Sequence, residues 1–348
     1  MNRIVPPQRA NNRIIALCAA MILCTGLLTV GCEAPGRRLP PDQEVALESR
    51  ALDLLTRAAE SELDVLRANA MEALVKVDPE MGRPHFRAAL EVTTPLVRYA
   101  GCIASGDVRD RNSLPILRRL LEEPDARVRM AAAYAVYRCG ETGAGRILLD
   151  NLTDNPDEKM RAEAAYLIGK LGDRKATRAL QKAEPQETSS YVVVHIQTAL
   201  ALLGEIRMVD RLIEYMLKSD SVTRLLALQG LVELRDDRAR RALAYRVSDE
   251  SDYLETRLLA ARGLGKLGDP SGYRLAYAAL GYRAKGKQDE HDQMRVRVNA
   301  ALALGSIGDR KALGALRDLA EGEADERVQV AAAMAILQIV RADQPLRQ

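Results

Sequence analysis

The sequence predicts an all-α fold, a superhelix of about nine helical hairpins, from two periodic columns. Aliphatic residues follow a recurring position, usually a small residue, by four and by seven residues, which places the columns on one helical face. The recurring positions are Ala70, Gly101, Ala132, Ala164, Ile196, Ala227, Ala260, Ala300 and Ala332. They lie 31 to 33 residues apart, except for 40 between Ala260 and Ala300. A period of this size is typical of a solenoid, in which each repeat packs on its neighbours.

The first 31 residues are predicted to be a signal peptide. Three arginines and no acidic residue precede an unbroken apolar run over residues 14–30, which is the pattern of an export signal. Gly31-Cys32 then resembles a bacterial lipoprotein cleavage site, so Cys32 is the candidate lipidation residue. Two alternatives stay open: an ordinary cleaved signal, or an uncleaved anchor, for which 17 helical residues reach only about 25 Å.

Residues 32–43 are rich in proline and are expected to form a flexible tether. Residues 44–59 have an amphipathic pattern and are expected to form a helix that caps the first face of the solenoid. The solenoid is assigned to residues 44–341, with a short tail at 342–348. Nine hairpins spaced roughly 8–10 Å apart predict an elongated body on the order of 80 Å long.

Each repeat has recognisable helix ends. Short polar residues stand where they can accept hydrogen bonds from the first turn of each helix: Thr94, Asp125, Asp157, Ser189, Asp220 and Asp325. Glycines that tolerate a left-handed conformation end the helices: Gly140, Gly172, Gly204, Gly268 and Gly308. A second amphipathic helix follows in each unit. The last helix, residues 328–340, is unusually apolar, and either ends the solenoid without a good cap or receives a docking partner.

The run Asp-x-x-Val-Arg-x-x-Ala-Ala-x-Ala-Leu-x-x-Leu-Gly-Asp resembles HEAT repeats of the short type found in phycobilin lyases. The resemblance covers roughly residues 61–341. It implies a right-handed superhelix in which the Val-Arg helices line the concave side. It specifies the fold and says little about the task.

Composition argues against nucleic-acid binding. The chain has 51 basic and 48 acidic residues, and three of the basic ones lie in the leader, so the rest of the chain is balanced. There is no tryptophan and one phenylalanine, and no clustered basic surface of the kind that nucleic acid requires.

No catalytic, cofactor-binding or metal-binding residue is predicted, so the chain is expected not to be an enzyme. The three histidines do not converge with other ligand types in the pattern of a metal site. Two cysteines, Cys102 and Cys139, fall in core columns and are expected to be buried free thiols. An arginine column is interpreted as structural, with stems between units and guanidinium groups on acidic turn residues such as Asp125 or Asp157, rather than as an anion-binding stripe.

The candidate binding surface is the exposed stripe of the Val-Arg helices, one residue before, two after and six after the small column. Tyrosine and arginine are enriched at protein-binding hot spots, although the tyrosines can also simply pack on each other. The candidate residues are Tyr134, Tyr137, Arg138, Glu163, Tyr166, Lys170 and His195.

These features together predict an exported scaffold, lipid-anchored on the periplasmic side of a bacterial membrane, that binds a protein partner in the cell envelope. Two other functions stay open. One is an accessory subunit of a phycobilin-lyase-like enzyme, suggested by the repeat type. The other is a structural spacer without a specific partner.

Overall fold

The computed structural model describes residue 36 and residues 38–218, 220–284 and 290–342. All of these lie in one compact unit, residues 35–348. The described part contains 18 α-helices and no strand, which confirms the all-α class. The signal peptide and Cys32 fall outside the described residues, as does the centre of the long interval between Ala260 and Ala300.

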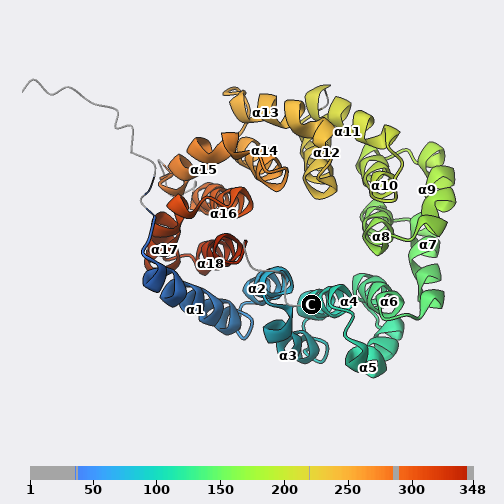
Figure 1. Ribbon diagram of the computed structural model, residues 1–348. Coiled ribbons are helices and arrows are strands. Elements are labelled where there is room, and N and C mark those ends of the chain that lie inside the picture. Colours follow the sequence, from blue (N-terminus) through green and yellow to red (C-terminus); the bar gives the residue numbers. More distant parts are fainter. Residues whose placement is uncertain (1–35, 37, 219, 285–289, 343–348) are drawn as a thin grey trace, which may run out of the picture. The chain divides into compact units, whose positions relative to one another are not determined.

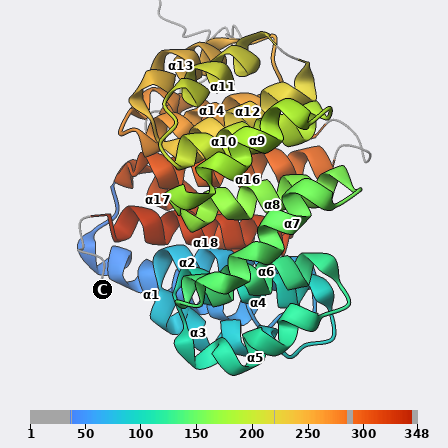
Figure 2. The same cartoon turned by 90° about the vertical axis from the view of Figure 1, so that its right-hand side faces the viewer.

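The helices form two concentric layers (Figure 1). The inner layer contains the helices that carry the small column: α2 (Asp64–Val77), α4 (Pro95–Asp107), α6 (Ala126–Arg138), α8 (Glu158–Leu171), α10 (Ser190–Leu202), α12 (Ser221–Leu234), α14 (Leu254–Lys266), α16 (Glu290–Ile307) and α18 (Glu326–Val340). The outer layer contains α1 (Pro41–Ala58), α3 (Pro79–Ala89), α5 (Leu114–Arg119), α7 (Gly145–Asp154), α9 (Thr177–Ala183), α11 (Arg207–Lys218), α13 (Arg240–Ser248), α15 (Tyr273–Leu280) and α17 (Leu313–Gly322). Figure 2 shows several inner helices lengthwise and roughly parallel to one another.

Small residues allow neighbouring inner helices to approach closely. A Cβ atom added to Gly169 of α8 would lie 2.7 Å from the Cα atom of Ala199 in α10, and one on Gly265 of α14 would lie 2.7 Å from the backbone nitrogen of Ile307 in α16. Both distances are too short for real Cβ contacts. The small residues therefore fix how closely the repeats stack.

The predicted helix ends are found with two exceptions. The glycines predicted to end helices all have positive φ angles, from 72° at Gly172 to 113° at Gly140. Aspartate side chains accept hydrogen bonds from first-turn backbone N–H groups at Asp125, Asp157, Asp220 and Asp325. The prediction was wrong for Thr94 and Ser189, whose side chains make no capping hydrogen bond.

The arginine column is structural, and guanidinium groups of the column do meet acidic residues of the turns as predicted, although these residues are glutamates and not Asp125 or Asp157. Arg161 donates to the carbonyls of Asn155 and Pro156, at the end of the preceding outer helix, and to the carboxylate of Glu187 in the next unit. Arg98 makes the same set of contacts with Val92, Thr93 and Glu123. Arg98 and Arg161 thus each tie three successive helices together, whereas the N-cap aspartates are occupied by the first turn of their own helix.

The two ends of the repeat array pack against each other. Within the inner layer, α18 contacts both α16 and α2. From the outer layer, α1 contacts the inner helices α18 and α2. Among the residues that the structure describes, no outer helix follows α18, and α1, from the other end of the chain, packs against α18 from the outer layer (Figure 1). Leu47 and Leu55 of α1 are fully buried in the same apolar cluster as Ile336 and Ile339 of α18.

Polar contacts reinforce this closure. Arg341, just after α18, donates to Glu48 of α1 at 2.7 Å, to the Val77 carbonyl at 2.7 Å and to Asp78 at 3.1 Å. Arg310 pairs with Glu44 of α1. The repeats therefore form a closed ring within this unit.

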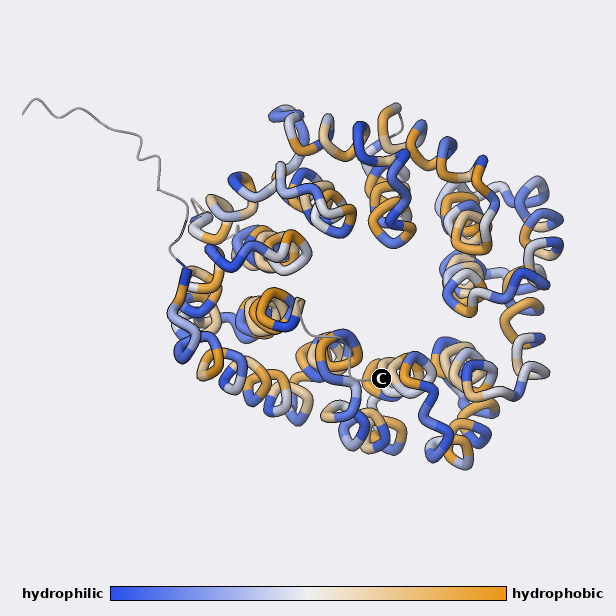
Figure 3. Tube along the Cα trace, viewed as in Figure 1, coloured by the Kyte–Doolittle hydropathy of each residue, from blue (hydrophilic) through white to orange (hydrophobic). Residues whose placement is uncertain are grey.

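Closure corrects two expectations. The array is not an extended body with two free ends, because its ends are in contact. The apolar last helix is not exposed either: α1, α2 and α16 cover α18, whose apolar residues (orange in Figure 3) are mostly buried. This packing explains why α18 is so apolar: α18 contacts helices from both ends of the chain.

Candidate functional site

The candidate stripe lies on the inner side of the ring, where curvature brings α4 and α8 into contact across α6. The hydroxyl of Tyr99 in α4 donates to the carboxylate of Glu163 in α8. Lys170 of α8 donates to Asp107 of α4 at 2.8 Å. The predicted residues Glu163 and Lys170 are therefore occupied by partners two repeats away, a contact that helix periodicity does not reveal.

Tyr134 of α6 lies beneath these contacts and is not a surface residue. Only 1% of it is exposed, its hydroxyl donates to Asp107, and the Lys170 ammonium lies 5.6 Å from its ring centroid. Burial, together with the charge of Asp107, raises the pKa of Tyr134 well above its usual range. The prediction of a surface hot spot at Tyr134 was wrong, because the inward bend between α4 and α8 buries it.

Three other predicted residues do not join a common surface. Tyr137 lies near the outer helix α7, where its ring would meet a Cβ atom on Gly145 at 2.9 Å, and its hydroxyl donates to Asp173. Burial and this bond raise the pKa of Tyr137 to about 12. His195 of α10 makes a 2.8 Å ring-nitrogen contact with the carbonyl of Tyr191. Arg138 is half-buried and donates to the Gly106 carbonyl at 3.4 Å.

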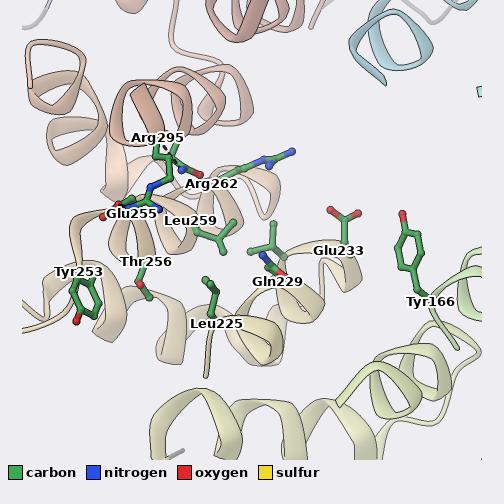
Figure 4. A pocket seen from close by; sticks show the side chains of 12 residues that line it. Tyr166, Leu225, Gln229, Glu233, Tyr253, Glu255, Thr256, Leu259, Arg262 and Arg295 are labelled. Carbon is green, nitrogen blue, oxygen red and sulfur yellow. Dashed lines mark hydrogen bonds and ion pairs between the residues drawn. The ribbon is translucent and has the colours of Figure 1, made fainter. Parts of the chain in front are cut away.

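Tyr166 is the predicted residue that does face open space. It is 39% exposed and borders a hollow of about 650 Å³ on the inner side of the ring. The other lining residues come from α12, the start of α14 and α16: Leu225, Gln229, Val232, Glu233, Tyr253, Glu255, Thr256, Leu259, Arg262, Arg295 and Asn299. Figure 4 shows Tyr166 on α8 facing the residues of α12 and α14.

Sequence reasoning missed this group although its signals were present. Arg262 and Gln229 stand two residues after the small column, as do Tyr134 and Tyr166. Tyr253 occupies the N-cap position of α14, where several other repeats have aspartate, and 70% of it is exposed. An aromatic residue in a capping position makes no capping hydrogen bond, so its presence there was the local signal of a different role.

Ion pairs neutralise most of the charges around the hollow. Lys266 donates to Glu233 at 3.1 Å, and Arg295 pairs with Glu255 at 3.4 Å. Burial by the surrounding protein opposes the charged form of Glu233, but Lys266, Lys76 and Arg262 outweigh it and hold the pKa of that carboxyl below its usual range. The inner surface at this hollow therefore combines charged, polar and apolar side chains.

The described residues contain no cluster that could hold a metal ion. No group of three or more His, Cys, Asp or Glu side chains within this part of the chain is arranged to hold a metal ion. Cys102 and Cys139 are free and buried, as predicted. Burial raises the pKa of the Cys102 thiol far above its usual range, so it is a packed side chain and not a nucleophile. Among the helices that the structure describes, none is long and apolar enough to cross a membrane.

Comparison with known proteins agrees with the repeat assignment. The family described as HEAT repeats matches residues 83–166 and 145–231, and the family described as PBS lyase HEAT-like repeat matches residues 296–322. No curated protein matches the sequence.

Solved structures similar to this chain include the complex of CpcE and CpcF of phycocyanin lyase from Nostoc sp. PCC7120, at 21% identity and a TM-score of 0.42, covering 70% of this chain and 94% of that one. Human deoxyhypusine hydroxylase in complex with glycerol is similar at 18% identity and a TM-score of 0.35, covering 86% of this chain and 99% of that one. The arginine column, the glycine-ended helices and the family matches lead to one conclusion: residues 83–231 and 296–322 of the chain are HEAT repeats.

Proposed function

We propose that this protein is a non-catalytic scaffold that binds a segment of a partner protein on the inner side of its ring. The observation that carries the proposal is the hollow beside Tyr166, where Leu225 is 39% exposed and Tyr253 is 70% exposed. Solvent-exposed aromatic and aliphatic side chains beside charged ones are typical of protein-binding surfaces. The inner charges that are paired across repeats hold this surface in a fixed geometry.

A position-specific cross-linking experiment tests this proposal. A photoreactive amino acid replaces Gln229, which is exposed inside the ring, or Tyr245, which is 59% exposed on the outer helix α13. Irradiation of intact cells should yield a discrete protein adduct from position 229 and none at the same mass from position 245. Equal adduct patterns from both positions, or none from position 229, would count against binding on the inner side.

We further propose that the scaffold is held at a membrane of the bacterial cell envelope, on its periplasmic side, by lipid on Cys32. The support is the sequence: a basic leader, an apolar run, then Gly31-Cys32. The first residue of α1, Pro41, lies nine positions after Cys32, a span of at most about 30 Å when fully extended. Lipidation would therefore keep α1 within about that distance of the bilayer.

Mass spectrometry of the mature N-terminus, with detergent partitioning of wild type and Cys32→Ala, tests the anchor. A diacylated Cys32 in wild type and its loss from the detergent phase in the variant are expected. A mature N-terminus at Met1 or well beyond Cys32 would disprove lipidation, without affecting the proposal for the inner surface.

A second candidate function is an accessory role in chromophore handling. It is favoured by the match of residues 296–322 to the PBS lyase HEAT-like repeat, and by a hollow whose volume lies within the usual range for small-molecule sites. Absorbance titration of the purified protein with a free bilin is the test. A saturable spectral shift that Tyr166→Ala abolishes would favour this function over the scaffold.

A further inference from the structure

Two rows of side chains on neighbouring inner helices line one wall of the hollow, and the space between these rows is called the groove here. Leu225, Gln229 and Glu233 recur every fourth residue along α12. On α14, Glu255, Leu259 and Arg262 recur at intervals of four and three. These intervals place each set on one face of its helix, and Figure 4 shows the two rows side by side.

The length of the groove suits a short extended segment. From Glu255 to Arg262 the α14 row spans 7 residues, or about 10 Å at 1.5 Å per residue. An extended chain rises about 3.3 Å per residue, so this distance holds about three residues. Gln229 is exposed midway along α12, where its amide can donate to and accept from a peptide backbone.

Arg262 distinguishes one end of the groove. Its Nε–H is buried and has no hydrogen-bond acceptor, whereas the other two cations beside it, Lys266 and Arg295, each have a carboxylate partner. Arg262 is half-buried and extends from α14 toward the side of Glu233 and Tyr166 in Figure 4.

The surroundings of Arg262 favour an additional negative charge. Burial, and then the nearby charges of Arg262 and Arg235, lower the pKa of Lys266 despite its bond to Glu233. Lys76 and Glu72 of the facing helix α2 also lie near Arg262 and Glu233, so four cations and two carboxylates meet at this end of the groove and positive charge is in excess. A guanidinium group binds a carboxylate through two parallel hydrogen bonds, which is the strongest pairing open to it.

Apolar side chains lie one helical turn away. Leu259 precedes Arg262 by three residues, and Leu225 lines the groove from the facing helix. Three residues of helix rise about 4.5 Å, and the arginine side chain extends further. Side chains two residues apart in an extended segment point to the same face, about 6.6 Å from each other. An apolar side chain over the leucines and an acidic one two residues further on therefore match the groove.

We infer that the groove between α12 and α14 binds an extended segment of the partner protein with an apolar residue followed two positions later by an acidic residue. The apolar side chain packs on Leu225 and Leu259, the carboxylate pairs with Arg262, and Gln229 hydrogen-bonds to the backbone of the segment. This inference rests on the proposed scaffold function, to which it adds the chemistry of the bound segment.

Charge exchange tests the inference. The probes are three fluorescein-labelled peptides with blocked C-termini, Ser-Leu-Ser-Glu-Leu-Ser and its versions with Gln or Lys in place of Glu. Fluorescence polarisation should show the Glu peptide binding to the intact protein at least tenfold more tightly than the Gln peptide, because a bond between two charged groups is worth about that factor or more. Arg262→Glu should lose the Glu peptide and bind the Lys peptide in its place.

The control is Arg241→Glu, which makes the same change of net charge at an exposed position of the outer helix α13. It should bind the Glu peptide like wild type, and far-ultraviolet circular dichroism should show the same helical content for both variants. Equal affinities for the three peptides, no binding of the Glu peptide at millimolar concentration, or equal effects of the two variants would overturn the inference.

The two proposals fail separately. If the peptides do not bind but a cross-linked partner forms at position 229, the scaffold function stands and the segment chemistry is wrong. If neither occurs, both are wrong. Binding of the Glu peptide through Arg262 without any cross-linked partner would support the groove chemistry and remove the support for an envelope partner.

Discussion

Closure of the ring predicts an energetic coupling between residues at opposite ends of the sequence. Arg341 donates to Glu48, 293 positions earlier, at 2.7 Å. Both side chains are mostly buried, with 23% and 22% of their surface exposed. Replacing each residue by alanine, singly and together, gives a double-mutant cycle for this pair.

The structure sets the expected magnitude. Exposed ion pairs contribute about 0–1 kcal/mol, and hydrogen bonds to charged groups contribute about 1.5–3 kcal/mol. Partial exposure reduces the second figure through solvent screening, so a coupling of about 1–2 kcal/mol is expected. Arg341→Ala alone should cost more than the coupling, because it also removes the bonds to Val77 and Asp78.

Urea unfolding followed by circular dichroism measures these free energies. The matched control is the pair Arg57 and Asp53, which lie within α1, four residues apart, and are 73% and 65% exposed. Their coupling should be about 0.3–0.5 kcal/mol. If Arg341 and Glu48 show no more coupling than this control, α1 does not close the ring in solution, and the array is an open solenoid.

Three further results are expected from the same unfolding measurement. Tyr134→Ala should destabilise the protein by about 3–5 kcal/mol because the Tyr134 ring is buried. Tyr166→Ala, at the exposed equivalent position, should change the free energy of unfolding by less than about 0.5 kcal/mol. Equal effects of the two variants would contradict the burial of Tyr134. Gly169→Ala should destabilise the protein despite the higher helix propensity of alanine, because the added Cβ atom would meet α10. Gly314→Ala in α17, where no atom lies within 4 Å of the added Cβ atom, should stabilise the protein by up to about 1 kcal/mol. Stabilisation at both sites would contradict the close approach of α8 and α10. A hydrogen bond from Arg87 holds the pKa of Asp110 below its usual range despite burial. The contribution of this ion pair to the free energy of unfolding is therefore present above the unfolded pKa of about 3.9 and is lost as the pH falls toward the folded pKa. Asp110→Asn should reduce the loss of stability at acid pH, and an unchanged loss would exclude the ion pair as its cause.

The repeat frame could be predicted because it is encoded locally. The columns that start from Ala70 and end at Ala332 specify which helix face is buried, and each glycine with positive φ lies within two residues of the end of its helix. Such features depend on residues fewer than ten positions apart, where helix periodicity is decisive. The placement of the inner helices on the concave side came from the resemblance to HEAT repeats and not from this frame.

Features set by accumulated curvature could not be predicted in this way. Tyr134 and Tyr166 occupy the same column, yet one is buried and the other borders the hollow. The difference arises because α4 and α8 meet across α6, as the bond between Lys170 and Asp107 shows. A small rotation per repeat, summed over nine repeats, decides such contacts, and no single repeat encodes it.

The amphipathic pattern of residues 44–59 illustrates the same limit. It predicted a helix with one apolar face, and Leu47 and Leu55 are indeed buried. That helix was expected to cap the first face of the solenoid, and α1 does contact α2, but it also covers α18, which lies nearly 300 residues later and which the pattern does not indicate. Only the closed ring of repeats brings the apolar face of α1 and the unusually apolar α18 together.

Closure also limits what the inner surface can bind. The hollow of about 650 Å³ is bordered by α8 on one side and by residues of α12, α14 and α16 on the other. A folded domain of 100 residues has a radius of gyration of about 13 Å and is far larger than this space. A partner therefore reaches the groove beside Arg262 as an extended segment, or after α1 has separated from α18. Cross-linking α1 to the end of α18 through cysteines at positions 48 and 341 should leave the affinity for the short Glu peptide unchanged. The cross-link should slow the capture of a folded partner if the ring must open to admit that partner. Loss of peptide binding on cross-linking would show instead that the groove itself depends on an open ring.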